Sequence, residues 1–584
     1  MQNYIRYDKG IVAIAVCCFL SLILPYHVHP YRAFYNELLP IFGVAVAVAF
    51  CIEQRVISWS IPKSALLPIL VSIIIAIQAA SGMFVSAADA LIPIAYLWMT
   101  SLAICLGATL ATQRDGHERL IHDLALAFLL AALVSVCIAT LQFIGEEGRL
   151  GSLAMQMPHQ AGQNVRPYAN TGQPNQLALF FCVAIAAVWW FYQVRKIGMG
   201  AAAGLTVTLL WGLALTQSRI GWLIIPTYAV LMYRWRRVAH FRRLSIISIL
   251  ALPITYSALI AALPKIAQLL KVSASSAVER VQTGAERISL FEQAWAISWQ
   301  HPWQGAGWFQ FGPQQLHVAL EFQQSIYAEH SHNIVLNLAA ELGWPVAITV
   351  IAAVGAWFIA SWRSPIKTKG VAFSTLLFWA AGIHSMLEFP LWYAYVLIPI
   401  ALLIGSAHQT QFGSRQIAIP RTVIAFIFVL MAAGMVAIAT DYRRLVISFR
   451  ALGFENLGLT PDEGSTKKPE FTMFPQFYEY FSFTKNQAHA GMTPDEIAKM
   501  EHSASRFGYA PVVMRMSLVY VLNGREDDAV KAMSIILKLH PSHYSEAYAS
   551  WKKLSVDQPA IYAAAFRRFT PPISNSSLQK KIGG

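Results

Sequence analysis

Apolar stretches long enough to cross a lipid bilayer recur along most of this chain. A hydrocarbon core about 30 Å thick needs roughly 20 mainly apolar residues per helix, and about thirteen stretches approach this length. They are residues 10–25, 37–53, 65–80, 90–111, 124–144, 176–194, 198–216, 219–234, 244–264, 333–361, 371–386, 393–408 and 421–440. Charged residues make up only 13% of the chain, roughly half their share in soluble proteins. We therefore predict an all-α, polytopic bundle of membrane helices.

Lysine and arginine gather in alternate short loops between these stretches. Loops 81–89 and 387–392 contain neither residue, whereas the basic loops are 54–64, 112–123, 195–197, 235–243, 362–370 and 409–420. Because basic loops face the cytoplasm in membrane proteins, we predict a cytoplasmic N-terminus and a C-terminus on the outer face. This placement accounts for the net charge of +14 and argues against nucleic-acid binding.

Two long segments interrupt the membrane stretches on the predicted outer face. Residues 145–175 are polar and turn-rich, and residues 265–332 include a helical pattern from Arg287 to Trp295. Loops of this length are usually functional. Together these features predict four regions: transmembrane helices 1–264 with the outer loop 145–175, a large outer loop 265–332, transmembrane helices 333–440, and an outer helical domain 441–584.

The last region carries a recognisable helical hairpin. A helix, an Asn523-Gly524 turn, a second helix and Pro541 follow one another. This order resembles a tetratricopeptide-type hairpin. A single such hairpin predicts a small helical domain, which could hold a protein partner or simply cap the membrane part.

The segment from Glu329 to Asn333 is a polar step that leads directly into an apolar stretch. If a helix begins at His332, then Asn333, Asn337 and Glu341 recur at four-residue steps and form one polar stripe. Such a stripe must face the interior of a membrane bundle. A neutral histidine above it can act as a general base.

Two other interpretations of this segment remain open. In an extended chain His330 and His332 would share a face and could bind a metal ion, but no third ligand is apparent and zinc sites usually show more clustered ligands. All six cysteines lie within apolar stretches, which argues against a zinc site or a disulfide framework. His332 could also merely anchor its helix at the membrane surface.

Two further clusters on the same predicted face contain amides and an arginine. Residues 171–176 place amide side chains at the start of a helix, an arrangement that also fits an N-terminal cap. Ser218-Arg219 follows at the outer end of a helical hairpin. Arg219 either extends to lipid headgroups or grips a phosphate, and Arg287 could add a second grip.

The fourth cluster runs from His384 to Tyr395. His384 and Glu388 are one helical turn apart and could pair. Its aromatic residues also fit a belt at the membrane interface. A serine-hydrolase role for Ser385 lacks the strand–turn–helix context that such a nucleophile needs.

Taken in order, these motifs resemble the bacterial protein O-oligosaccharyltransferases of the PglL type, the pilin-glycosylating members of the O-antigen ligase and polymerase superfamily. The resemblance covers the whole chain, and five motifs in one order are far more specific than any one alone. A departure is Pro174, where relatives often carry a basic or polar residue. The motifs are Gly172-Gln173-x-Asn175, Ser218-Arg219, the loop with Arg287, Pro302, Gly305 and Gly307, His330-Ser331-His332-Asn333, and residues 384–393.

The resemblance implies transfer of a preassembled glycan from undecaprenyl diphosphate to a Ser or Thr hydroxyl of an exported protein such as type IV pilin. The active site would face the periplasm, in the bacterial inner membrane. Neither a nucleotide sugar, nor a metal, nor another cofactor is implied. The expected partners are therefore the lipid-linked donor, the acceptor protein and membrane lipid.

Residue roles follow from the same resemblance. His332 corresponds to the essential histidine, Gln173 to the essential amide, and Tyr393 to the functional tyrosine, with Tyr395 as its alternative. Arg219 and Arg287 would hold the diphosphate. The remaining residues of the predicted substrate-binding set are Asn175, His330, Asn333 and Glu388.

Three alternatives differ in what they bind. An O-antigen ligase would transfer to lipid A core, and an O-antigen polymerase to another lipid-linked glycan. The segment 389–393 and the C-terminal domain favour a protein acceptor instead. A transporter or flippase would be expected to show inverted repeats and paired broken helices, and no convincing repeat is present in the sequence.

Overall fold

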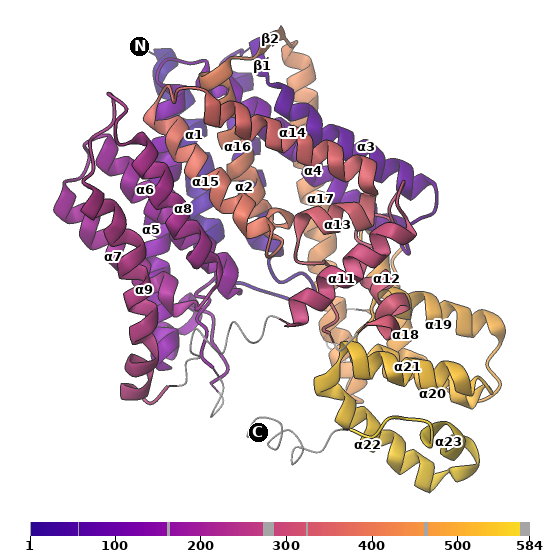
Figure 1. The fold of residues 1–584 in the computed structure, drawn as a ribbon. Coiled ribbons are helices and arrows are strands. Elements are labelled where there is room, and N and C mark those ends of the chain that lie inside the picture. The colour runs from indigo at the N-terminus through magenta and orange to yellow at the C-terminus, as the bar shows by residue number, and fades with distance from the viewer. Residues whose placement is uncertain are drawn as a thin grey trace. The chain divides into compact units, whose positions relative to one another are not determined.

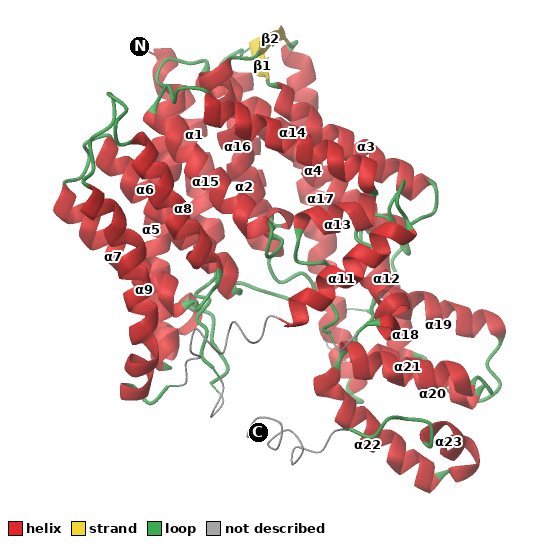
Figure 2. Ribbon diagram, in the orientation of Figure 1, coloured by secondary structure: helices red, strands yellow, loops and turns green. Residues whose placement is uncertain are grey.

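A computed structural model describes residues 2–56, 58–159, 164–272, 285–322, 325–460 and 465–572 (Figure 1). Within these ranges the chain is mainly helical, with loops between the helices (Figure 2). The sheet consists of two short antiparallel strands, β1 (Ser58–Ile61) and β2 (Arg415–Ala418), with Ser58 opposite Ala418. The predicted all-α fold class is thus confirmed.

The chain divides into two compact units, which are described separately. The first comprises residues 1–73, 93–282 and 352–440. The helices that lie wholly or partly in it are α1 (Gln2–Ile23), α2 (Phe34–Glu53), α3 (Leu66–Ala80), α4 (Leu91–Ala111), α5 (Gly116–Ile144), α6 (Pro174–Gln193), α7 (Met199–Leu215), α8 (Ile220–Trp235), α9 (Ile246–Leu269), α14 (Trp344–Arg363), α15 (Lys369–Ser385), α16 (Ala394–Phe412) and α17 (Arg421–Asn456).

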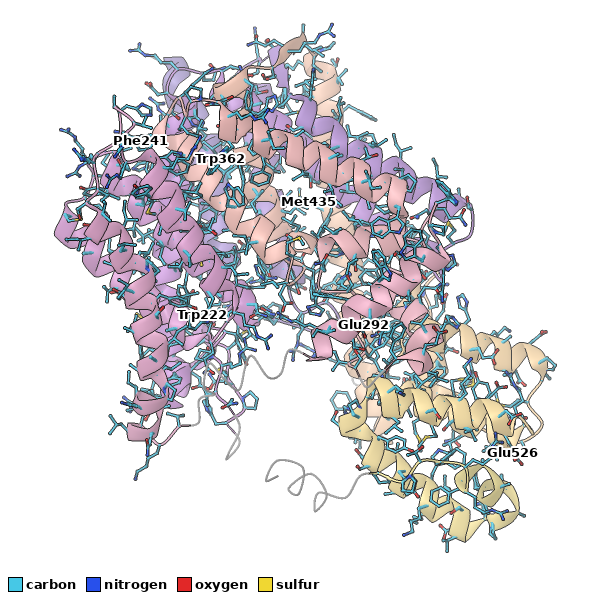
Figure 3. The ribbon with its side chains drawn as sticks, viewed as in Figure 1. Trp222, Phe241, Glu292, Trp362, Met435 and Glu526 are labelled. Atoms are coloured by element: carbon cyan, nitrogen blue, oxygen red, sulfur yellow. The ribbon has the colours of Figure 1, made fainter. Side chains whose placement is uncertain are left out.

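Helix α6 is the central helix of the first unit. It packs against α5, α7, α8 and α15, and nearly all of its residues are buried. Trp222 on α8, by contrast, is exposed (Figure 3). Small residues permit the closest helix contacts: a Cβ at Gly107 of α4 would collide with the backbone of Leu402 on α16. Close approach at small residues is how membrane helices gain packing contacts in lipid.

Eight helices among the described residues are long and apolar enough to cross a membrane. They are Phe34–Glu53, Lys63–Ala80, Ala88–Ala111, Gly116–Ile144, Pro174–Gln193, Ile246–Leu269, Trp344–Arg363 and Arg421–Asn456. Shorter apolar helices include Lys9–Ile23 and Met199–Leu215. The protein is therefore a multi-pass membrane protein, while the number of about thirteen spans and their orientation stay predictions.

The predicted span 333–361 is wrong, because it consists of two helices. Helix α13 (Ile334–Leu342) ends at Gly343, which has a φ of 82°, and α14 begins at Trp344. A Cβ at Gly343 would lie 2.5 Å from the carbonyl oxygen of Trp303, so only glycine fits this break. The nine residues of α13 are too few to span a bilayer. The last predicted span also extends, since α17 continues to Asn456.

The second unit comprises residues 74–92, 283–351 and 441–584. Besides α13 it contains α11 (Ala285–Gln300), α12 (Phe311–Val318), α18 (Pro475–Lys485), α19 (Pro494–Arg506), α20 (Ala510–Leu522), α21 (Glu526–Leu539), α22 (Pro541–Asp557) and α23 (Pro559–Phe566). The expected helical hairpin is α20–α21, with Gly524 at a φ of 74° in its turn. Buried Trp551 packs on Phe569 and Tyr562 in the core of this helical domain.

Candidate active site

The start of α6 confirms that the amide cluster forms a helix cap. Gln173 is the N-cap residue, and its side-chain oxygen accepts a hydrogen bond of 2.7 Å from the backbone N–H of Gln176. Pro174 occupies the first helical position, where its missing N–H costs nothing. The cap uses only the carbonyl oxygen of the Gln173 amide, so its NH₂ group takes no part in the capping bond.

Asn175 joins three segments that are far apart in the sequence. Its side-chain Nδ2 donates to Glu388 Oε1 at 2.8 Å. Its Oδ1 accepts from Ser218 Oγ at 2.8 Å and from Arg166 Nη2 at 3.3 Å. Glu388 is buried, so this contact supplies a partner that a carboxylate away from water requires. We call this group of four side chains the Asn175 network.

Arg166 was not among the predicted site residues. It lies in the predicted outer loop 145–175, and its Nε also donates to the carbonyl oxygen of Thr216 at 3.3 Å. The neighbouring Gln217 Nε2 donates to Val165 O at 2.8 Å, with Gln217 itself at a φ of 50°. A non-glycine residue in this left-handed region stores strain, which is typical of functional sites. An arginine on a face expected to carry few basic residues was the signal that could have identified it.

Arg219 directly follows this strained turn. It precedes the first residue of α8 and is half-buried. Because the hydroxyl of Ser218 bonds to Asn175, the backbone at Arg219 is fixed to the Asn175 network. The flexible side chain of Arg219 therefore extends from a backbone whose position is fixed.

The aromatic segment after α15 presents two tyrosines in different environments. The ring of Tyr393 stacks on Phe389 at 6.1 Å and on Tyr395 at 5.2 Å between centroids. Tyr395 is buried and contacts Phe180, whereas Tyr393 is half-exposed. A substrate can therefore reach Tyr393 more easily than Tyr395, which favours the preferred assignment.

Glu37 holds the same segment and was also missed in the sequence. Its carboxylate accepts a hydrogen bond of 2.8 Å from the hydroxyl of Tyr96 and one of 3.2 Å from the backbone N–H of Ala394. Ala394 is the first residue of α16, whose N-terminal N–H groups lack partners within the helix. A carboxylate at this position fixes where the helix begins, and with it the adjacent Tyr393.

In the second unit, the polar stripe shapes the histidine segment. Asn333 caps α13 by accepting from the N–H groups of Val335 and Leu336, both at 3.1 Å. Asn337 Oδ1 accepts from the N–H of Ser331 at 2.9 Å. The third member of the stripe, Glu341, accepts from the N–H of a residue in α12 at 3.4 Å. Asn337 and Glu341 are buried, but the predicted membrane helix starting at His332 is wrong, because α13 begins at Ile334 and has only nine residues.

The two histidines of this segment differ sharply. His330 is buried and packs edge-on against Phe309, with 5.1 Å between ring centroids. Burial, reinforced by the neighbouring His332 imidazole and the Arg506 guanidinium, lowers the pKa of His330 to about 3. A histidine of such low basicity is a poor general base near neutral pH. His332 is half-exposed, so it is the histidine that a substrate can reach.

His332 has a φ of 58°, in the left-handed region. The metal interpretation required an extended chain that put both imidazoles on one face, and this backbone contradicts that premise. Within the part of the chain that the structure describes, no group of three or more His, Cys, Asp or Glu residues could hold a metal ion. The strained conformation is instead fixed by the Asn333 cap that follows it.

Comparison with known proteins finds two matching family models and two similar proteins. The family model described as O-antigen ligase matches residues 204–351, and the model described as virulence factor membrane-bound polymerase, C-terminal, matches residues 373–554. The general O-oligosaccharyltransferase of Acinetobacter baylyi is 24% identical over 541 residues, which is 91% of this chain and 92% of that protein. This chain is a homologue of the bacterial O-oligosaccharyltransferases. The ComP-specific O-oligosaccharyltransferase of the same organism is 23% identical over 412 residues, 69% of this chain and 72% of that protein.

In this O-oligosaccharyltransferase homologue the predicted site residues fall into two sets. The first unit contains Gln173, Asn175, Arg219, Glu388, Tyr393 and Tyr395; the second contains Arg287, His330, His332 and Asn333. Arg287 lies in the first turn of α11 and is half-buried. The structure brings Asn175 to Glu388 within the first unit, and it orders the histidine segment within the second. That both sets serve one reaction stays a prediction.

Proposed function

We propose that this protein transfers a preassembled glycan from undecaprenyl diphosphate to a Ser or Thr hydroxyl of an exported, pilin-like protein at the periplasmic face of the inner membrane. The observation that carries the proposal is the similarity to a general O-oligosaccharyltransferase over 91% of this chain. That similarity supports glycosyltransfer in protein O-glycosylation at the level of the family. The donor, the acceptor and the residue roles are our extension of it.

Departure of the diphosphate is the step that arginines would assist. As the bond from the anomeric carbon to the phosphate oxygen breaks, negative charge grows on the diphosphate. Fixed cations aimed at such charge are among the largest contributions to catalysis. Arg219 and Arg287 are half-buried, so each can reach a ligand while remaining partly shielded from water. With two guanidinium groups on the diphosphate, the proposed reaction needs no divalent metal.

Activation of the acceptor is the step assigned to His332. A Ser or Thr hydroxyl is a weak nucleophile, and a positioned neutral imidazole can take its proton as the bond to the sugar forms. The accessible His332 suits this role, whereas His330, two residues earlier, is buried. Gln173 and Tyr393 would orient the donor or the acceptor through their amide and hydroxyl groups.

The histidine role is tested by His332→Ala. We expect the variant to accumulate in the membrane like wild type but to leave a co-expressed pilin-like acceptor unglycosylated, as read from the intact acceptor mass. The matched control is His543→Ala, an exposed histidine of the helical domain, which should glycosylate normally. Normal glycosylation by His332→Ala would refute the assignment.

Two acceptors other than protein are favoured by the family models themselves. The O-antigen ligase model suggests lipid A core, and the polymerase model suggests a second lipid-linked glycan. Lipopolysaccharide from the same cells separates the three outcomes. Glycan on the protein acceptor with unchanged lipopolysaccharide supports the proposal, whereas glycan only on lipid A core, or only lengthened lipid-linked chains, would replace it.

A further inference from the structure

A buried ion pair in the second unit has no role in the reaction as proposed so far. Arg506, the last residue of α19, donates from Nε to Asp89 Oδ2 at 2.7 Å and from Nη2 to Asp89 Oδ1 at 3.3 Å. The two side chains are only 5% and 3% exposed. Burying such a pair costs desolvation, so it is weak evidence for stability alone.

The same guanidinium contacts the histidine segment. Its Cζ lies 4.8 Å from the ring centroid of Phe309, and that ring packs against His330. Arg506 Nη1 also lies 3.9 Å from the carboxylate of Glu329, the residue before His330. Glu329 in turn accepts from the hydroxyl of Tyr509 at 3.3 Å.

The chain leading to the histidines lies along the C-terminal helices. The N–H groups of Ser325 and Tyr327 donate to the carbonyl oxygens of Lys538 and Leu539, at 2.8 and 3.0 Å. The hydroxyl of Tyr327 accepts from the N–H of Gly508 at 3.3 Å. Contacts therefore run almost continuously from residue 325 to His330.

We propose that Arg506 is a positioning residue for the histidine segment, and that the C-terminal helical domain holds this segment in its reactive geometry. Arg506 contacts both Phe309, whose ring packs against His330, and Glu329, the residue before His330, and His330 precedes the strained His332 by two residues. The Arg506 guanidinium therefore orients the histidine segment, while the carboxylate of Asp89 balances its positive charge. This inference rests on the proposed function and gives the helical domain a part in it.

Kinetics of the purified full-length enzyme, with lipid-linked glycan and acceptor, test this inference. Arg506→Lys keeps the charge but loses the planar, bidentate contact. We expect kcat to fall about ten- to a hundredfold, since small displacements of catalytic groups cost this much, with the KM for the donor unchanged. Arg525→Gln, an exposed arginine of the same domain that pairs with Glu501 and Asp528, serves as control and should match wild type.

A second variant separates positioning from stability. Phe309→Leu leaves the ion pair intact but removes the ring between Arg506 and His330. A lower kcat at an unchanged melting temperature supports positioning, whereas wild-type kcat in both Arg506→Lys and Phe309→Leu overturns it. If Arg506→Lys does not accumulate, the kcat of Phe309→Leu decides alone. Inactive wild type would instead refute the proposed function, so the two failures are distinguishable.

Helix α11 carries a different, independent feature. Its buried face contains Leu290, Ala294 and Ile297, and its opposite face exposes Ile288, Trp295 and Trp299 by half or more of their surface. Glu292 lies on this exposed side (Figure 3). The two tryptophans contact Trp344 with ring centroids 5.6 and 5.9 Å away.

Trp344 connects this face to a membrane helix. It is the first residue of α14, a candidate span of which only 11% is buried, so most of the α14 surface is available to lipid. Tryptophan is enriched where membrane helices leave the hydrocarbon. The exposed face of α11 is therefore continuous with a lipid-facing surface, as in helices that lie in the membrane interface.

We infer that α11 lies in the bilayer interface, with its tryptophan face in contact with phospholipid. Given the proposed function, this depth places Arg287 in its first turn at the level of the donor diphosphate. Photocrosslinking of the full-length protein in phosphatidylglycerol–phosphatidylcholine vesicles with a diazirine in the acyl chain tests it. We expect label on residues 288–303 and on exposed Ile348 of α14, but none on α22; label on α14 without label on α11 would overturn the inference.

Discussion

The Asn175 network and the histidine segment use the same residue types in opposite ways. In the network, amide, hydroxyl, guanidinium and carboxylate side chains bond to one another, so Asn175 fixes Ser218 and Glu388. In the histidine segment, Asn333 and Asn337 bond to backbone N–H groups. The Asn175 network thus joins elements that are distant in sequence, whereas the polar stripe fixes the backbone of one short segment. Mutations in the Asn175 network should therefore disturb several elements at once, and mutations in the stripe mainly one loop.

The largest effect is expected when the centre of the network gains a charge. Asn175→Asp puts a carboxylate beside Glu388, and like charges at such distance repel strongly. We expect transfer activity to fall about a hundredfold, because displacing a site by about 1 Å can cost this much. The double variant Asn175→Asp/Glu388→Gln restores a donor–acceptor pair and should recover most of the activity.

The control for that experiment is Asn164→Asp, the same change at an exposed position of the same loop. It should leave transfer unchanged. If the double variant is as inactive as Asn175→Asp, the bond between Asn175 and Glu388 is not what the network needs. Transfer is read from acceptor mass, normalised to membrane-inserted enzyme.

A pH-dependent change in stability is expected in the histidine segment. Burial raises the pKa of Glu341, which lies outside the candidate spans, from an ordinary 4.5 to about 8. Because its folded-state pKa is higher than its unfolded one, folding is destabilised as pH rises from 4.5 to 8. Glu341→Gln removes this titration, so its melting temperature relative to wild type should increase between pH 5 and pH 8.

Exposed Glu292→Gln on α11 provides the comparison, since its melting difference should stay constant across this range. A Glu341→Gln difference that does not change with pH would mean that the carboxyl is ionised in the folded protein. An ionised Glu341 would then hold the histidine segment, much as Glu388 does in the Asn175 network. The histidine segment and the network would differ less than we propose.

The smallest effect is expected at the edge of the network. Arg166→Lys loses one 3.3 Å contact to Asn175 while keeping the charge. Since a hydrogen bond contributes about 0.5–1.5 kcal/mol, we expect transfer to fall about two- to tenfold. Arg149→Lys, an exposed arginine in the same loop, should have no effect. A loss as large as that of Asn175→Asp would show that Arg166 binds the donor directly.

Much of the fold could be predicted from local sequence patterns. Hydrophobic length located most of the long apolar helices, and the Asn523-Gly524 turn located the hairpin α20–α21, because both depend on neighbours in the chain. Length alone could not reveal the break at Gly343, which is set by the approach of Trp303 from another loop. Tertiary packing, and not helix propensity, therefore determines where the helix breaks.

The sequence by itself identified the candidate residues, since motif order does not depend on coordinates, and their roles in the reaction stay predictions. Only the tertiary structure decided what holds them: Asn175 meets Glu388 across 213 positions, and Arg506 meets Asp89 across 417. It also separated buried His330 from accessible His332, two positions that a pattern cannot distinguish. Hydrogen bonds and burial between distant segments are properties of the folded chain, so no local window of the sequence contains them.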